Sequence, residues 1–193
     1  MNFLAHLFLS CETEELIVGN MIADFIRNRE MATYHSDIQK GVLLHRQIDT
    51  YTDQHPKVLQ GVHRLRPRHR KYAPVVIDIL YDHLLSKNWS RYSGRTLQEF
   101  ADAMYEVLRK HLPVMPVKLQ NRLVGMIDGN WLVGYGSIEG LRYTLERMDQ
   151  RTRFPSNFAH AIEDLQQDYG AYESEFNAFF PEVITFVEQQ CRC

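Results

Sequence analysis

The chain has 193 residues and a formal net charge of -2, with 45% hydrophobic and 24% charged residues. This length can bury a core without disulfides, and we expect one domain over residues 1–193. The balanced charge argues against a general nucleic-acid binder. Three cysteines, two of them at positions 191 and 193, are not the pattern of a disulfide framework and favour a reducing cytoplasm.

The first ten residues are apolar, but they do not resemble a signal peptide. They carry His6, and acidic residues follow at Glu12, Glu14 and Glu15, where a signal peptide has the opposite pattern. No run reaches the roughly 18 to 20 apolar residues that a membrane-spanning helix needs. We therefore expect a buried N-terminal helix and no membrane insertion.

Apolar residues recur at steps of three and four along most of the chain, which predicts an all-α fold. Glycines in 128–136 indicate a kinked helix or a turn, and Pro181 is expected to end the last long helix before a short final one. The predicted helices span Glu14–Arg27, Ser36–Asp53, Pro74–Asn88, Leu97–His111, Pro116–Met126, Ile138–Arg151 and Ser156–Phe179.

Histidines and aspartates interrupt several of these apolar helices. A buried carboxylate is costly unless it is paired or binds a metal, so several such interruptions in the first 85 residues favour one shared polar centre. The residues concerned are His6, Asp24, His45, Asp49, Asp78, Asp82 and His83.

The spacing of these residues is compatible with a metal site. His45 and Asp49 are four apart, as are Asp78 and Asp82, so each pair shares a helix face. Imidazole with carboxylate suits Mn²⁺, Fe²⁺ or Zn²⁺. Each residue alone also fits a core histidine, a helix cap or an ion pair, and only their coincidence favours the metal. Arg27 and Arg46 stand beside the candidates and could bind phosphate or pair with an aspartate.

A basic run precedes the helix that carries Asp82. It holds five fixed positive charges in nine residues, and it could be a solvated loop or a docking patch for an acidic protein or a phosphate-bearing ligand. Its cations are Arg64, Arg66, Arg68, Arg70 and Lys71.

Several motifs, in this order, resemble the bacterial acyl carrier protein phosphodiesterases along nearly the whole chain. They are Met-Asn-Phe-Leu-Ala-His-Leu at 1–7, Gly-Asn-Met-Ile-Ala-Asp-Phe-Ile-Arg at 19–27, His-Arg-Gln-Ile-Asp at 45–49 with Thr52 and Asp53, Tyr-Asp-His-Leu-Leu-Ser at 81–86 with Trp89, and Trp-Leu-Val at 131–133.

The resemblance implies an HD-phosphohydrolase-like helical enzyme that works with Mn²⁺. Its reaction would release 4′-phosphopantetheine from the serine of holo-acyl carrier protein, a small acidic protein, and leave apo-acyl carrier protein. On this interpretation the basic run receives the carrier protein. The expected metal ligands are Asp24, His45, Asp49, Asp82 and His83, with His6 or His83 as proton donor and Arg27 and Arg46 offsetting phosphoryl charge.

One feature departs from the usual HD pattern, because the adjacent pair here is Asp82 followed by His83 rather than His followed by Asp. The ligand set therefore rests on this sequence's own pattern. Two other hypotheses fit the same residues. One is an HD-type phosphohydrolase of a small nucleotide or phosphoester, and the other is a non-catalytic helical module that binds acidic proteins.

Overall fold

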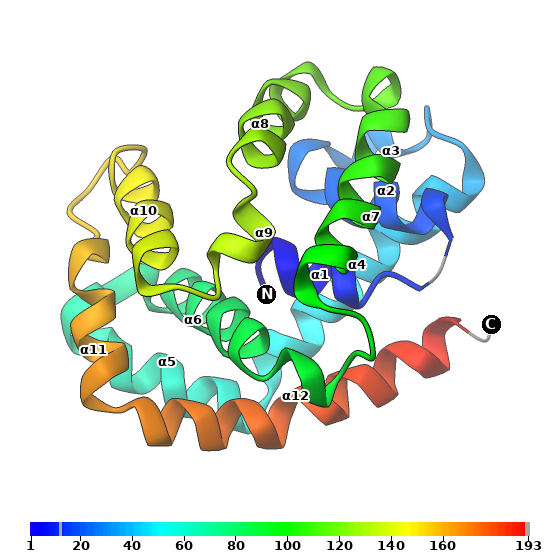
Figure 1. The fold of residues 1–193 in the computed structure, drawn as a ribbon. Coiled ribbons are helices and arrows are strands. Elements are labelled where there is room, and N and C mark those ends of the chain that lie inside the picture. Colours follow the sequence, from blue (N-terminus) through cyan, green and yellow to red (C-terminus); the bar gives the residue numbers. More distant parts are fainter. Residues whose placement is uncertain (12, 192–193) are drawn as a thin grey trace.

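The computed structural model describes residues 1–11 and 13–191, and within these ranges it is all-α and has no strand. The prediction of an all-α protein is confirmed. Among the described residues, five short 3-10 helices lie between the α-helices (Figure 1). In chain order the elements are α1 (Phe3–Phe8), α2 (Glu14–Ile22), η1 (Ala23–Phe25), α3 (Asn28–Met31), α4 (Ser36–Gln54), α5 (Pro56–His69), η2 (Arg70–Tyr72), α6 (Ala73–Lys87), η3 (Trp89–Arg91), α7 (Leu97–Lys110), η4 (Leu112–Val114), α8 (Val117–Asp128), α9 (Trp131–Gly134), α10 (Ile138–Asp149), η5 (Phe158–His160), α11 (Ala161–Gln167) and α12 (Tyr169–Cys191).

The predicted helices agree best with the structure where apolar residues recur at steps of three and four over a long stretch, as in α4, α6 and α7. Residues 14–27 instead break after α2 into the turn η1, and the predicted helix 156–179 is divided at Asp168 between α11 and α12. The expected end at Pro181 is wrong, because α12 continues through it to Cys191. Val183 and Val187 beyond the proline are buried, so their packing outweighs the one backbone hydrogen bond that proline removes.

Helix α5, which contains most of the basic run, was not predicted from the sequence. Its apolar residues Val58, Val62 and Leu65 recur at helical steps and are all buried. Pro56 occupies the first turn, where proline is tolerated, and His55 Nδ1 accepts a hydrogen bond from the Lys57 amide at 3.2 Å. The basic run is therefore mostly the polar face of a helix rather than a loop.

Helices α2 and α4 cross at two glycines. A Cβ atom on Gly19 would lie 2.7 Å from the Gly41 Cα, so only glycine lets the two backbones approach this closely. The crossing fixes the spacing between the residues that flank it, Asn20 on α2 and His45 one turn beyond Gly41 on α4.

The short helix α1 lies near the middle of the molecule, beside α2, α4 and α6 (Figure 1). Its first turn is held by the buried carboxylate of Asp82 on α6, which accepts hydrogen bonds from the backbone amides of Leu4 at 2.9 Å and Ala5 at 3.2 Å. These are amides that the helix itself cannot satisfy. Asp82 thereby sets the position of His6, one residue farther along α1.

The long helix α12 runs beneath the other helices, and its aromatic residues pack into the core (Figure 1). At its end Cys191 is disulfide-bonded to Cys11, just after α1. The cysteine pattern of the sequence did not indicate this disulfide, because the fold brings together two residues that lie 180 positions apart. Cys193 lies outside the described residues. Within the described part of the chain, no helix combines the length and apolar character needed to cross a bilayer.

Candidate metal centre

Four side chains from three elements converge beside α1. His6 Nε2 lies 3.1 Å from Asp49 Oδ1, and His45 Nε2 lies 3.1 Å from Asp49 Oδ2. Asp24 on η1 completes the group, with its Oδ1 3.3 Å from His45 Nε2. His6, His45 and Asp49 each offer a ligand atom, and these three atoms lie within 4.8 Å of one another, close enough to share one metal ion. We call these three residues and Asp24 the metal centre.

Local structure explains how the two histidines are placed. His45 and Asp49 lie one turn apart on the same face of α4. The His6 ring, from α1, stacks on the His45 ring at a centroid distance of 3.9 Å and an angle of 13°. Both histidines are buried, whereas the Asp24 side chain is 71% exposed. The centre therefore has a dry histidine side and a carboxylate that faces solvent.

Asn20 is a residue of the site that the sequence reasoning missed. Its Oδ1 accepts a hydrogen bond from His45 Nδ1 at 2.9 Å, and its Nδ2 donates to the His6 carbonyl oxygen at 2.9 Å and to Ser10 Oγ at 2.8 Å. These contacts hold the His45 proton on Nδ1 and leave Nε2 directed at Asp24 and Asp49. A buried polar residue between Gly19 and Met21 was the same signal that singled out Asp24, and it could have found Asn20.

The charges at the centre are strongly coupled. Burial opposes protonation of His45, but Asp24 and Asp49 outweigh it and raise its pKa to about 9. Burial lowers the pKa of His6 to about 4, against the opposing pull of Asp49. Burial also disfavours ionised Asp49, yet contacts with His45 and His6 hold the pKa of its carboxyl well below the usual range. Asp49 is therefore an anion that needs a cation beside it.

The centre fits a divalent metal. His45 Nε2 is buried without an aligned hydrogen bond, and two carboxylates lie within 3.3 Å of it, so they stabilise a cation at this position, whether a proton or a metal ion. A cavity of about 20 Å³ opens next to His6, Asp24 and His45, which is room for one water-sized group. Two imidazoles and two carboxylates are a donor set that Mn²⁺, Fe²⁺ and Zn²⁺ accept.

The amino group of Met1 adds a positive charge at the edge of the centre. It lies 3.0 Å from Asp78 Oδ1 and 3.8 Å from Asp49 Oδ1. Burial opposes its ionisation, but these carboxylates raise the pKa of the amino group overall. Asp78 is thus paired with this ammonium, and it does not reach the histidines.

The other predicted ligands, Asp82 and His83, do not join the metal centre. Both carboxylate oxygens of Asp82 accept backbone amides of α1, and burial raises its pKa to about 7. His83 Nδ1 donates to the Tyr135 carbonyl oxygen at 2.6 Å. Arg27 and Arg46 lie near the centre in sequence, but neither guanidinium forms an ion pair within residues 1–11 and 13–191. 

Two of the five cations of the basic run are paired with carboxylates of α11 and α12. Arg64 forms two hydrogen bonds with the buried carboxylate of Glu175, at 2.9 and 2.7 Å. Arg68 lies 3.0 Å from Glu163 and 3.2 Å from Asp164, and Lys71 lies over the Phe154 ring. Arg66 and Arg70 are exposed. Part of the basic run therefore serves to join α5 to the C-terminal helices α11 and α12.

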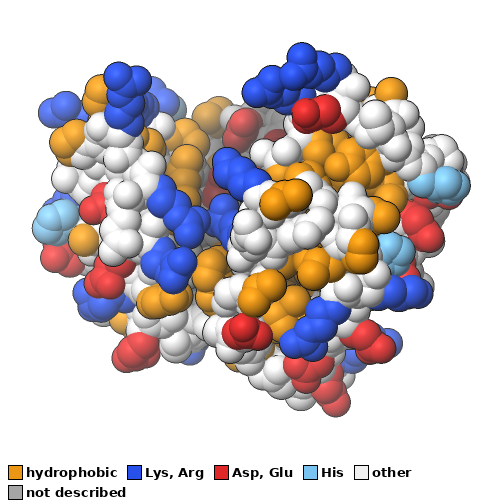
Figure 2. Space-filling model, turned by 90° about the horizontal axis from the view of Figure 1, so that it is seen from above, with side chains coloured by type: hydrophobic (Ala, Val, Ile, Leu, Met, Phe, Trp, Pro, Cys, Tyr) orange, Lys and Arg blue, Asp and Glu red, His pale blue; other side chains and the backbone are white. Residues whose placement is uncertain are grey.

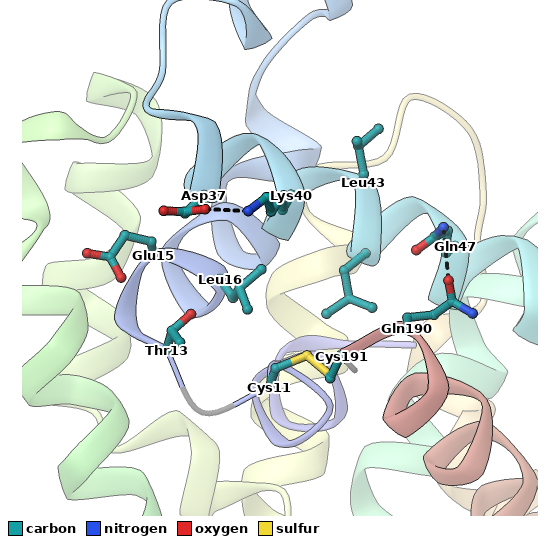
Figure 3. Close-up of a pocket in the computed structure, with 11 residues that line it drawn as sticks. Cys11, Thr13, Glu15, Leu16, Asp37, Lys40, Leu43, Gln47, Gln190 and Cys191 are labelled. Carbon is teal, nitrogen blue, oxygen red and sulfur yellow. Dashed lines mark hydrogen bonds and ion pairs between the residues drawn. A yellow bond between two sulfur atoms is a disulfide. The ribbon is translucent and has the colours of Figure 1, made fainter. Parts of the chain in front are cut away.

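A larger cavity of about 550 Å³ lies away from the metal centre, between α4 and the end of α12 (Figure 3). The Cys11–Cys191 disulfide forms one wall, and Lys40 and Asp37 form an ion pair at 2.7 Å across another. None of the metal-centre residues lines it. Size alone therefore does not mark the functional site.

The acyl carrier protein phosphodiesterase family matches residues 1–183. The chain belongs to this family. Similar proteins named acyl carrier protein phosphodiesterase include one from Photorhabdus laumondii, 31% identical over 98% of this chain and 96% of its own length. Another from Escherichia coli O157:H7 is 33% identical over 95% of this chain and 96% of its own.

No solved structure matches the chain. The family resemblance drawn from the sequence motifs is confirmed, and so is the prediction of an enzyme of the acyl carrier protein phosphodiesterase family. Three of the family-like motifs, 1–7, 19–27 and 45–49, supply every residue of the metal centre, and Asn20 lies in the second.

Proposed function

We propose that the chain is a metal-dependent phosphodiesterase that hydrolyses the bond between 4′-phosphopantetheine and the serine of holo-acyl carrier protein. The observation that carries this proposal is the metal centre of His6, His45, Asp49 and Asp24, in a member of this family. The products would be apo-acyl carrier protein and 4′-phosphopantetheine. We also propose the cytoplasm as its location, on the ground of the substrate alone, because the Cys11–Cys191 disulfide removes the argument from the cysteines.

The residues of the metal centre and Asn20 would have different roles in this reaction. His6, His45 and Asp49 hold the ion, and Asn20 fixes the orientation of His45. A divalent ion, for which we propose Mn²⁺, supplies Lewis acidity toward a phosphoryl oxygen and toward water. Asp24 is ionised, because its contact with His45 lowers the pKa of its carboxyl, and it faces solvent. It is placed to ligate the ion from the open side or to accept the proton of the attacking water.

The test uses metal-stripped protein and holo-acyl carrier protein, with and without Mn²⁺, and follows the mass of the carrier protein. We expect loss of the phosphopantetheine mass only with metal, and none with Asp49→Asn. Asp53→Asn is the matched control, because Asp53 lies one turn along α4 on the surface, outside the centre. Equal hydrolysis by wild type and Asp49→Asn, or hydrolysis in excess chelator, would refute the proposal. Turnover of free nucleotides instead would favour the small-molecule phosphohydrolase.

A further inference from the structure

A cationic groove lies between α8 and α10. Its cavity of about 400 Å³ is lined by Lys118, Arg122, Arg147 and Arg151, together with Phe25 and Trp131, and among its described lining residues there is no aspartate or glutamate. Figure 2 shows Lys and Arg side chains gathered on the walls of a hollow on this face. We call it the α8–α10 groove.

Arg122 is the innermost cation of this groove. Its guanidinium lies over the rings of Phe3 at 4.9 Å and Phe25 at 5.9 Å, and its Nε is buried without a hydrogen-bond partner. Burial, together with repulsion from Arg151, lowers its pKa. A desolvated guanidinium without a carboxylate partner is a position that favours an incoming anion.

The other cations line the wall and the rim of the α8–α10 groove. Arg147 is held in place by the Tyr143 hydroxyl at 2.7 Å and by the Trp131 ring at 5.5 Å. Lys118 and Arg151 are exposed, and no carboxylate of the described residues lies within ion-pair distance of either. This differs from the basic run of α5, where Arg64 and Arg68 are already neutralised by carboxylates of the chain itself.

The groove continues toward the metal centre. Asn2 and Phe3 line the small cavity at the centre, and they also line a neighbouring cavity that shares Arg122, Arg147 and Arg151 with the groove. Phe25, in the groove, follows Asp24 directly. Asp24 is near enough to attract the Arg122 guanidinium and partly offset the fall in its pKa. An anionic partner in the groove therefore has a short path to the open side of the centre.

We propose that the α8–α10 groove, and not the basic run of α5, is the docking surface for the acidic protein substrate. The inference rests on the proposed function for the identity of that partner, the carrier protein. Carboxylates of the partner face Lys118, Arg147 and Arg151, while Arg122 receives the negative charge closest to the scissile phosphodiester. Such charge complementarity acts chiefly on association and its salt dependence.

The experiment compares two double variants that each remove two positive charges. The double variant Arg147→Ser, Arg151→Ser removes two positive charges from one wall of the groove. The double variant Arg66→Ser, Arg70→Ser removes two exposed positive charges from the alternative docking surface, the basic run. Binding of dye-labelled holo-acyl carrier protein is measured by fluorescence anisotropy, in chelator so that no turnover occurs, over a salt series. We expect Kd at low salt to rise roughly tenfold or more for the groove variant, with a flatter salt dependence, and to change less than about twofold for the control.

Two further measurements separate docking from folding and catalysis. Lys118→Glu reverses one exposed charge at the groove and should also weaken binding, and the urea midpoint of unfolding and the Mn²⁺ affinity of metal-stripped protein should stay unchanged in all variants. Equal effects of both double variants, a larger effect of the α5 variant, or no binding by wild type would overturn the docking surface. Groove-dependent binding without hydrolysis by wild type would leave the docking surface standing and refute the proposed reaction.

Discussion

The side-chain oxygen of Asn20 accepts the Nδ1 hydrogen of His45 at 2.9 Å, while the amide nitrogen of Asn20 donates to the His6 carbonyl oxygen. One side chain on α2 thus ties together the two histidines that come from α1 and α4. It fixes which His45 nitrogen is free for a metal, without being a ligand itself.

Replacing Asn20 with alanine should therefore weaken metal binding while leaving all four ligand side chains in place. We expect Mn²⁺ affinity to fall about 10- to 100-fold, the usual range for loss of a partner that orients a ligand. Isothermal titration of metal-stripped protein measures it. Asn88→Ala is the control, because the Asn88 side chain donates a hydrogen bond to the Leu84 carbonyl oxygen at the end of α6, away from the metal centre. An unchanged affinity in Asn20→Ala would show that the hydrogen bond does not orient His45.

Metal affinity should rise with pH, because a metal can bind only the neutral imidazole of His45. Asp24 and Asp49, acting against burial, raise its pKa to about 9, so protons compete with metal throughout the neutral range. We expect affinity to increase by roughly tenfold per pH unit between about pH 7 and 9. Metal titrations at three pH values in that range test this, and an affinity independent of pH would contradict it.

The same proton should make the metal-free protein less stable as pH rises. The pKa of His45 lies above its ordinary value of 6.5 in the folded state, so its contribution is complete below about pH 6.5. That contribution is lost as pH rises through about 9. Urea unfolding in excess chelator should show a falling free energy of unfolding over this window, and saturating metal should reduce the fall.

The metal centre was predictable only in part from the sequence. His45 and Asp49 are one turn apart, so their convergence follows from helix geometry alone. Asp24 and Asp82 both interrupt apolar stretches and give the same sequence signal, yet one faces the histidines and the other caps α1. What separates them is the packing of α6 against α1, which no local pattern encodes.

The free cations of the protein were even less predictable from the sequence than the metal centre. A run of cations is visible in the sequence at 64–71, but the carboxylates that neutralise Arg64 and Arg68 lie about a hundred residues away on α11 and α12. The groove cations are spread over 118–151, so they form no run. Charge density along a chain therefore does not report which cations remain free after folding.

Glu175 should be needed for stability, because it is buried and forms two hydrogen bonds with Arg64. Removing it leaves the half-buried guanidinium without its partner. We expect Glu175→Ala to lower the free energy of unfolding by about 2–4 kcal/mol, less than for a fully buried pair because the Arg64 side chain is 28% exposed. Chemical unfolding measures the change. The control is Glu188→Ala, which replaces an exposed residue on the same helix. A loss equal to that of the control would show the pair to be dispensable.

The glycine crossing of α2 and α4 should be intolerant of even one methyl group. A Cβ on Gly19 would lie 2.7 Å from the Gly41 Cα, a backbone atom that cannot move aside without separating the helices. We expect Gly19→Ala to cost about 1–3 kcal/mol of unfolding free energy, as overpacked cores do. Because the crossing also sets the distance from Asn20 to His45, metal affinity should fall in the same variant.

The matched control for that variant is Gly170→Ala. Gly170 also lies in a helix, but nothing comes within 4 Å of the position its Cβ would take. Its substitution should leave the free energy of unfolding within about 0.5 kcal/mol of the parent and metal affinity unchanged. If Gly19→Ala behaved in the same way, the close approach of the two helices would have to be relaxed in solution. The hydrogen bond that orients His45 would then need another source of rigidity.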